Sequence, residues 1–403
     1  MERLLCLLSR VGAWSESRPI FKQSAPKVVG NSRTLDVDAD LGLSREVVFA
    51  GITTMLVVSG LLSPTFGRLY DVYGPRRQMA AGSLIAASSL VIMSMAQGPF
   101  VYLLSWAIFG VSMPMALSTT AVAAVVQIGG AHARRAITGL TIIAGMTSVF
   151  FLPLGAWIEA RYGWRTTILL YASLHILICL PLHLVFAPER KVQQNAAMPD
   201  PDIPWESPLD PSMRKRVFAL IAIWSCCEGM LVWGFNMQAI DILQGLGLTL
   251  PAAVGVWMLS GPSQSSARVF ELLFSSRYSI MTTAFAAAAL APLGFVLFYA
   301  AGVSVASASV MAVCYGLGHG FFAIARNVVP LRLFGLREFN VVMGRLALPQ
   351  NLINGAAPVL YAALIGRVGA EAALWCSAAF AISSLCAVLM LRRVAATLPK
   401  PSA

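Results

Sequence analysis

The stretch Gly67-Arg-Leu-Tyr-Asp-Val-Tyr-Gly-Pro-Arg-Arg77 lies between two long apolar segments and decides the fold class. The segment before it, Val47 to Phe66, and the segment after it, Gln78 to Gln97, contain no charged residue. Each has about the 20 residues that an α-helix needs to cross the hydrocarbon core of a bilayer. The stretch therefore predicts a short, basic, glycine-bracketed turn between two membrane helices.

The composition points to the same class of protein. Hydrophobic residues make up 58% of the 403 residues and charged residues only 12%, whereas soluble domains contain about 25% charged residues. A soluble protein could not solvate such a surface, so we predict an all-α integral membrane protein. The sequence contains no glycine-rich phosphate loop and no catalytic constellation. We therefore expect no enzyme, no cofactor and no metal site.

The hydropathy pattern predicts eleven apolar spans. They cover residues 47–66, 78–97, 100–126, 136–158, 166–186, 217–240, 251–267, 279–300, 303–331, 341–365 and 371–391. Nearly all Arg and Lys residues between them fall in one alternate set of loops, and the other set contains only Arg161, Arg165 and Arg367. Because basic residues collect on the cytoplasmic side of membrane proteins, the rich set and the C-terminus are predicted to be cytoplasmic. The formal charge of +11 thus reports orientation, not a nucleic-acid partner.

A polar, proline-rich stretch divides the chain into two halves. We predict an atypical polar segment at 1–45, helix bundles at 46–187 and 217–395, a cytoplasmic linker at 188–216 and a tail at 396–403. The two bundles repeat each other: a shift of 200 residues places Asp71 on Glu271 and Arg77 on Arg277. Such duplication is typical of transporters whose halves are related by an axis along the membrane normal.

The quoted stretch resembles the signature loop of the major facilitator superfamily of secondary transporters, Gly-x-Leu-x-Asp-x-x-Gly-x-(Arg/Lys), through Gly67, Leu69, Asp71, Gly74, Arg76 and Arg77. The resemblance implies two pseudo-symmetric helix bundles that work by alternating access. It also implies that Asp71 meets the start of the 341–365 span near Asn340, and that Glu271 meets the start of the 136–158 span. The gating set that it implies is Gly67, Arg68, Asp71, Gly74, Arg76, Arg77, Arg268, Glu271 and Arg277.

Three ionisable residues inside predicted spans are the leading site candidates, because such groups are costly there and mark functional sites by default. Glu228 lies mid-span in 217–240, and His319 and Arg326 lie in 303–331 on one helical face. A carboxylate, an imidazole and a guanidinium facing one cavity could bind an anion, a proton, or both in turn. Each has a structural alternative: an ion pair for Glu228, simple packing for His319, and a snorkelling or gating position for Arg326.

Second-rank polar positions occur in the spans expected to meet between the halves: Gln264, Gln350, Asn351 and Asn354. Hydrogen bonding between helices is the simpler explanation for most of them. They remain candidates for lining a cavity.

The sequence favours a proton-coupled transporter of a small molecule, with efflux slightly ahead of uptake. One alternative is an uptake carrier for organic anions, and another is a transport-incompetent product of a truncated or frameshifted gene. The predicted partners are the bilayer, a small-molecule substrate and a proton or other coupling ion, and the expected form is a monomer in a bacterial inner (plasma) membrane. Substrate identity does not follow from the fold.

The N-terminal segment lacks a counterpart of the family's first helix. Its longest apolar run is Leu4 to Leu8, and residues 1–45 are rich in both basic and acidic side chains. No membrane-spanning helix can form from such a sequence. We therefore expect a fold of twelve helices minus the first, with a gap beside the second to sixth spans.

Overall fold

The computed structural model describes residues 40–43, 45–116, 120–122, 124–125, 133–188, 204 and 206–397. Within these ranges every regular element is helical and no strand occurs, which confirms the predicted all-α class. The prediction for the N-terminal segment concerns residues that lie mostly outside the described ranges.

The helices follow one another along the chain as α3 (Arg45–Ser94), α4 (Pro99–Ala116), α6 (Ala133–Leu174), the π-helical η3 (His175–Cys179), α7 (Leu180–Phe186), α8 (Pro211–Met230), the π-helical η5 (Leu231–Phe235), α9 (Asn236–Gly245), α10 (Leu250–Trp257), α11 (Ser260–Phe274), the 3₁₀ turn η6 (Ser275–Arg277), α12 (Ile280–Ala301), α13 (Val305–Arg367) and α14 (Ala370–Ala396).

Three of these helices are pairs joined at a single glycine. Gly74 in α3 has φ 76° and ψ 165°, Gly163 in α6 has φ 78° and ψ 167°, and Gly335 in α13 has φ 73° and ψ 168°. Positive φ is strained for residues with a side chain, so glycine allows the chain to reverse here without an intervening loop. The predicted loop at 332–340 is therefore a single non-helical residue inside α13.

Seven stretches of the described chain are long and apolar enough to cross a membrane: Ala50–Ser94, Pro99–Val122, Trp157–Phe186, Pro211–Gly245, Ile280–Ala301, Val305–Arg367 and Ala370–Ala396. Three of them contain one of the glycine breaks and so hold more than one helix. The chain is an integral membrane protein. The count of eleven spans stays a prediction.

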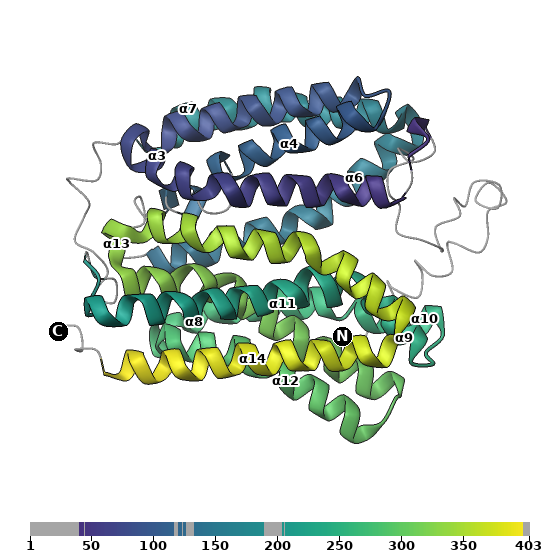
Figure 1. Ribbon diagram of the computed structural model, residues 1–403, viewed down its shortest axis with the longest axis vertical. Helices are drawn as coiled ribbons and strands as arrows, with labels where there is room; N and C mark the ends of the chain where they lie inside the picture. The colour runs from purple at the N-terminus through teal and green to yellow at the C-terminus, as the bar shows by residue number, and fades with distance from the viewer. Residues whose placement is uncertain are drawn as a thin grey trace, which may run out of the picture.

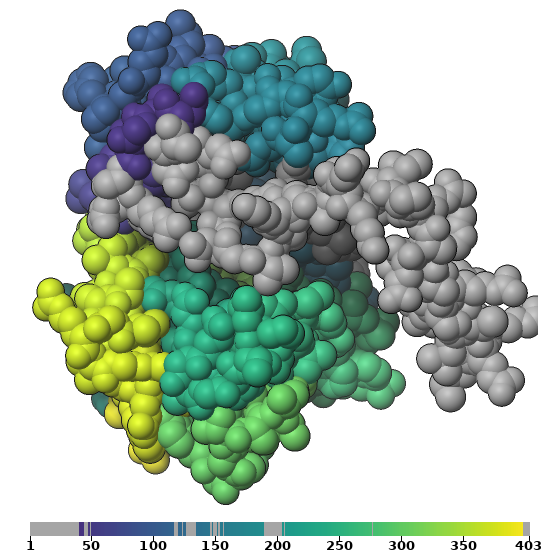
Figure 2. Space-filling model, turned by 90° about the vertical axis from the view of Figure 1, so that its right-hand side faces the viewer, coloured from purple at the N-terminus to yellow at the C-terminus, as the bar shows by residue number. Residues whose placement is uncertain are grey.

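The two halves of the chain form two bodies that lie side by side. In Figure 1, α3, α4, α6 and α7 form one body, and the helices from α8 to α14 form the other, with part of α13 lying against α3. Figure 2 shows the same division from the side, with the purple-to-blue N-terminal half separate from the green-to-yellow C-terminal half. Any path through the molecule between the halves is therefore bounded by helices from both.

The end of the predicted linker is packed against the C-terminal half. The Leu336 backbone N–H donates to the Pro204 carbonyl (3.1 Å), and the Ser207 hydroxyl donates to the Leu333 carbonyl (2.9 Å). Leu209 is only 3% exposed. Helix α8 also begins at Pro211 rather than at 217, because a helix can continue past its apolar span into polar residues.

Aromatic side chains fill the core of the C-terminal half. Phe235 lies at the centre of one cluster, with its ring centroid 5.3 Å from those of Trp257 and Phe295 and 5.5 Å from that of Tyr315. Edge-to-face pairs of this kind add about 0.5–1.5 kcal/mol beyond burial. They hold η5, α10, α12 and α13 in fixed positions around the ionisable residues of α8 and α13.

Candidate functional site

The halves approach most closely where α3 crosses the second part of α13. A Cβ atom on Gly67 would lie 2.6 Å from the Asn340 carbonyl oxygen, and one on Gly344 would lie 2.6 Å from the Ser63 carbonyl oxygen. Real Cβ contacts essentially never fall under 3.0 Å. Glycine at both positions is therefore what allows the two helices to touch backbone to backbone.

Farther along the same seam, the contacts continue through polar side chains. The Asn351 amide donates to the Ser59 hydroxyl (3.3 Å), and the Thr53 hydroxyl donates to the Gly355 carbonyl (3.1 Å). A Cβ on Gly60 would lie 3.1 Å from the Asn351 Cβ. The α3–α13 seam is thus closed from Thr53 to Gly67.

The signature loop, Gly67 to Arg77, lies at one end of the α3–α13 seam. The Asn340 amide nitrogen donates to the Asp71 carboxylate at 2.9 Å, which is the contact that the family resemblance implies. Hydrogen bonds to a charged acceptor contribute about 1.5–3 kcal/mol. Asp71 therefore ties α3 to the second part of α13 at this end of the molecule.

The basic residues of the loop take different positions. The Arg76 guanidinium donates through Nε to the Ala187 carbonyl at 2.9 Å, which links the loop to the end of α7. Arg68 and Arg77 are exposed. The loop arginines therefore lie at the surface of this end rather than inside the interface.

The second copy of the motif forms a buried ion pair. Glu271, with no exposed side-chain surface, accepts from Nη2 of Arg134 at 2.7 Å. The Tyr278 hydroxyl donates to the same carboxylate at 2.7 Å, and the Thr283 hydroxyl donates at 3.1 Å. Burial and the Glu271 hydrogen bond raise the pKa of the Tyr278 phenol above its usual value, so it stays a donor. Glu271 thus meets the start of α6, as the resemblance implies.

The sequence alone did not single out Arg134 as the partner of Glu271. Its position directly before the predicted 136–158 span is the signal that could have found it. Arg277 is exposed, and its guanidinium lies over the Phe274 ring at 5.3 Å rather than near a carboxylate. The second motif copy is therefore held by Arg134 and Glu271 from the two halves.

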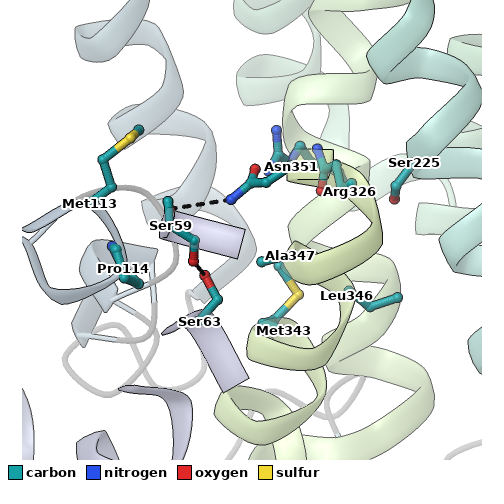
Figure 3. A pocket seen from close by; sticks show the side chains of 11 residues that line it. Ser59, Ser63, Met113, Pro114, Ser225, Arg326, Met343, Leu346, Ala347 and Asn351 are labelled. Atoms are coloured by element: carbon teal, nitrogen blue, oxygen red, sulfur yellow. Dashed lines mark hydrogen bonds between the residues drawn. The ribbon is translucent and has the colours of Figure 1, made fainter. Parts of the chain in front are cut away.

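A small cavity lies between the halves beside the α3–α13 seam (Figure 3). It has a volume of about 50 Å³, enough for a few water molecules. Its polar lining consists of Ser59 and Ser63 from α3, Ser225 from α8, and Arg326, Gln350 and Asn351 from α13. Among the described residues no carboxylate forms an ion pair with Arg326, and its guanidinium lies 5.9 Å from the Phe322 ring centroid. Within the part of the chain that the structure describes, the cavity therefore holds a positive charge without a paired carboxylate.

A larger cavity of about 620 Å³ lies between α6 and α11, on the other seam of the halves. Its lining includes Thr141 and Gly145 from α6, Gln264 and Arg268 from α11, and Ala323 from α13. The Arg268 guanidinium donates to the Thr141 carbonyl at 3.2 Å, while its Nε has no hydrogen-bond partner. A second guanidinium is thus placed at the interface, in a cavity large enough for an organic molecule.

His319 lies in the electrostatic field of two guanidinium groups, those of Arg268 and Arg326. Its ring is parallel to that of Tyr315, with centroids 6.1 Å apart, and its Nδ1 is buried without a hydrogen-bond partner. His319 and Arg326 are seven residues apart on α13, which places them on one helical face, but His319 lines neither of the two cavities described above.

Glu228 does not join this group. Its carboxylate, 4% exposed, accepts from the Ser384 hydroxyl of α14 at 2.7 Å. Ser225, three residues earlier on α8, lines the small cavity, whereas the hydrogen bond from Ser384 places the Glu228 carboxylate against α14. The expectation that Glu228, His319 and Arg326 face one cavity is corrected in this respect: Glu228 lines neither cavity described above.

Asn354 also has a structural setting. It is 5% exposed, lies against Gly229 of α8, and its amide oxygen has no hydrogen-bond partner. Of the other second-rank residues, Gln350 and Asn351 line the small cavity and Gln264 lines the large one. The hydroxyl groups of Ser59, Ser63 and Ser225 were not singled out in the sequence, because serine within an apolar span carries no distinctive signal.

The sequence profile of the Major Facilitator Superfamily matches residues 32–348. The chain belongs to the Major Facilitator Superfamily. Its fold is similar to that of the human organic anion transporter MFSD10 (TETRAN), with a TM-score of 0.66 and 16% identity over 87% of each chain. It is also similar to the proton:xylose symporter XylE bound to 6-bromo-6-deoxy-D-glucose, with a TM-score of 0.66 and 11% identity over 89% of this chain and 90% of that one.

No curated protein matches the chain significantly. Membership of the Major Facilitator Superfamily identifies the chain as a membrane transporter and not an enzyme. In this superfamily member the two motif copies, Asp71 with Asn340 and Glu271 with Arg134, join the halves at the ends of the two seams.

Proposed function

We propose that the chain is a proton-coupled secondary transporter that moves a small molecule between its two halves by alternating access. The observation that supports this most directly is the small cavity, which takes Ser59 and Ser63 from one half and Arg326 and Gln350 from the other. Because side chains from both halves line this cavity, its shape and its access to water change whenever the halves move relative to each other. The motif contacts of Asp71 and Glu271 would hold one end shut while the other opens, and the remaining loop residues would support this gating.

Glu228 is the proposed proton-binding group. It is 4% exposed within a membrane span, and its carboxylate accepts a hydrogen bond from a neutral hydroxyl, that of Ser384. Among the described residues no basic side chain forms an ion pair with it. A carboxylate without a cation is costly in such a place, so binding a proton stabilises the buried state and releasing it favours a state in which water reaches α8.

The experiment uses purified full-length protein in liposomes that contain a pH-sensitive dye. A panel of organic anions, sugars and organic cations is added outside, and compound-dependent proton movement is recorded. Glu228→Gln should abolish the proton movement while exchange of the labelled active compound continues. Glu371→Gln removes an exposed carboxyl from the same half and should behave as wild type.

Proton movement by Glu228→Gln equal to that of wild type would refute the coupling role of Glu228. The same vesicles, loaded or empty, test whether efflux is preferred to uptake. Well-folded protein that moves no compound and no proton would favour the transport-incompetent alternative.

The second candidate is an uptake carrier for organic anions. Arg326 favours it, because the cavity shared by the halves contains a guanidinium with no carboxylate partner among the described residues. A similar fold serves a transporter of organic anions in MFSD10. Uptake of an anion into empty vesicles, lost in Arg326→Gln, would support this candidate.

A further inference from the structure

We propose that the large cavity between α6 and α11 binds an amphipathic organic anion, with its acidic group against Arg268 and its apolar body between the two helices. This inference rests on the proposed transport function and specifies the class of substrate. It requires three properties of the cavity: sufficient volume, an apolar part, and positive charge that no protein carboxylate neutralises.

The size and lining suit such a molecule. The cavity has a volume of about 620 Å³, within the range of about 300–1,000 Å³ typical of small-molecule sites. Small and apolar residues form much of its wall: Ala144, Gly145, Gly261, Pro262 and Ala323. A Cβ on Gly261 would meet no atom within 4 Å. An apolar group can therefore occupy this space without displacing side chains.

No carboxylate of the described residues forms an ion pair with the guanidinium at one side of the cavity. Arg268 is 9% exposed, its Nε has no partner, and its hydrogen bond through Nη1 goes to the uncharged Thr141 carbonyl. Glu271 lies three residues away on α11, but its carboxylate is paired with Arg134. A buried charge without a counter-ion is strongly unfavourable. An incoming carboxylate, sulfate or phosphate would supply the missing counter-ion.

A second polar side chain lies beside Arg268 in the wall of the large cavity. Gln264 and Arg268 are spaced i and i+4 on α11, which places them on one helical face, and both line the cavity. Guanidinium groups bind carboxylates and phosphates through paired hydrogen bonds, and the Gln264 amide can add a further donor. Arg326 lines the small cavity instead.

The test is isothermal titration calorimetry on the purified full chain in detergent at pH 7, with three probes that separate the two parts of the ligand. They are 4-cyclohexylbutanoate, its uncharged amide, and acetate. Wild-type protein should bind the cyclohexylbutanoate at least tenfold more tightly than either other probe. Equal binding of the acid and the amide would overturn the inference, because it would leave no role for the charge. Equal binding of acetate would remove the role of the apolar wall.

Variants place the ligand in the cavity. Arg268→Gln should weaken binding of the acid at least tenfold and leave binding of the amide unchanged. Arg392→Gln removes an exposed guanidinium in α14 and should have no effect. Acid binding that survives Arg268→Gln would overturn the inference.

Two further variants guard against misfolding. Arg268→Lys keeps the charge and should retain binding of the acid within a few-fold, at an unchanged melting temperature. Gly261→Phe fills the apolar part and should abolish binding of the acid, so unchanged affinity in this variant would also overturn the inference.

Equilibrium binding separates this inference from the proposed function. Binding without any flux in liposomes would support the site and refute transport. Flux of another compound by a chain that does not bind the acid would refute the site and leave transport intact.

Discussion

Gly67→Ala tests whether close contact at the α3–α13 seam sets the balance between states. The added methyl group would lie 2.6 Å from the Asn340 carbonyl oxygen and 3.5 Å from the Gly344 Cα. Ordinary contact begins at 3.4 Å, so the helices must separate locally by about 0.8 Å. Because the obstacle is backbone, no side-chain rotation can relieve it.

The added methyl group changes the free energy in two ways, by overpacking the seam and by stabilising the helix. Overpacking of this kind costs about 1–3 kcal/mol, and in the proposed cycle only the arrangement with a closed seam bears that cost. Replacing a helical glycine by alanine also stabilises the helix by about 0.5–1 kcal/mol, but equally in both arrangements. The second contribution cancels, and the closed-to-open ratio should fall about 5- to 150-fold.

Hydrogen–deuterium exchange in lipid nanodiscs measures this change. Backbone amides in residues 63–72 and 337–346 should exchange faster in Gly67→Ala than in wild type. Gly139→Ala in α6 is the matched control, because a Cβ there would meet no atom within 4 Å. If the two variants showed the same exchange at both segments, close contact at Gly67 would not control the seam.

Three other outcomes are expected. Asp71→Asn should abolish transport in liposomes while the amount of protein in the membrane stays unchanged, and normal transport would contradict the gating role. Glu271→Gln leaves Arg134 without its counter-charge and should destabilise the protein by about 3–5 kcal/mol, seen as a lower melting temperature; an unchanged temperature would contradict the buried pair. Hydrogen bonds from Arg165 and Trp164 lower the pKa of Asp40 below its usual 3.8, so this contact stabilises the fold above that pH and is lost as the pH falls through the lowered value; an acid titration of tryptophan fluorescence should show a step that Asp40→Asn lacks.

Much of the fold could be predicted because membrane helices leave strong local signals. The apolar spans, the glycines at their ends and the repeat of Asp71 in Glu271 can all be read without knowledge of distant contacts. The partner of Asp71 was also predictable, since the family resemblance places the start of one particular span beside it. Helix ends were less so: α8 begins at Pro211, before its apolar part.

The orientation of single side chains within the spans could not be predicted in the same way. Glu228 and Ser225 lie in one apolar segment, and only packing against α13 and α14 decides which of them faces a cavity. The π-helical segment that follows at Leu231–Phe235 changes the angular spacing of later residues. That Arg268 lines the large cavity could not be predicted either, because its side-chain direction also depends on packing between helices. In the sequence, Arg268 appears only as part of the second copy of the loop motif.

The two seams differ in how deeply their motif contacts are buried, and this difference should govern which one opens with more difficulty. At the α3–α13 seam, Asp71, which accepts from the Asn340 amide, is half-buried. At the α6–α11 seam, Glu271 has no exposed surface and pairs with Arg134, whose side chain is 12% exposed, so opening must separate two largely buried charges. Water already reaches part of Asp71, whereas the buried pair needs rehydration of both ions. Because the large cavity lies on this second seam, the Arg134–Glu271 pair is the contact whose breaking would expose that cavity at the motif end.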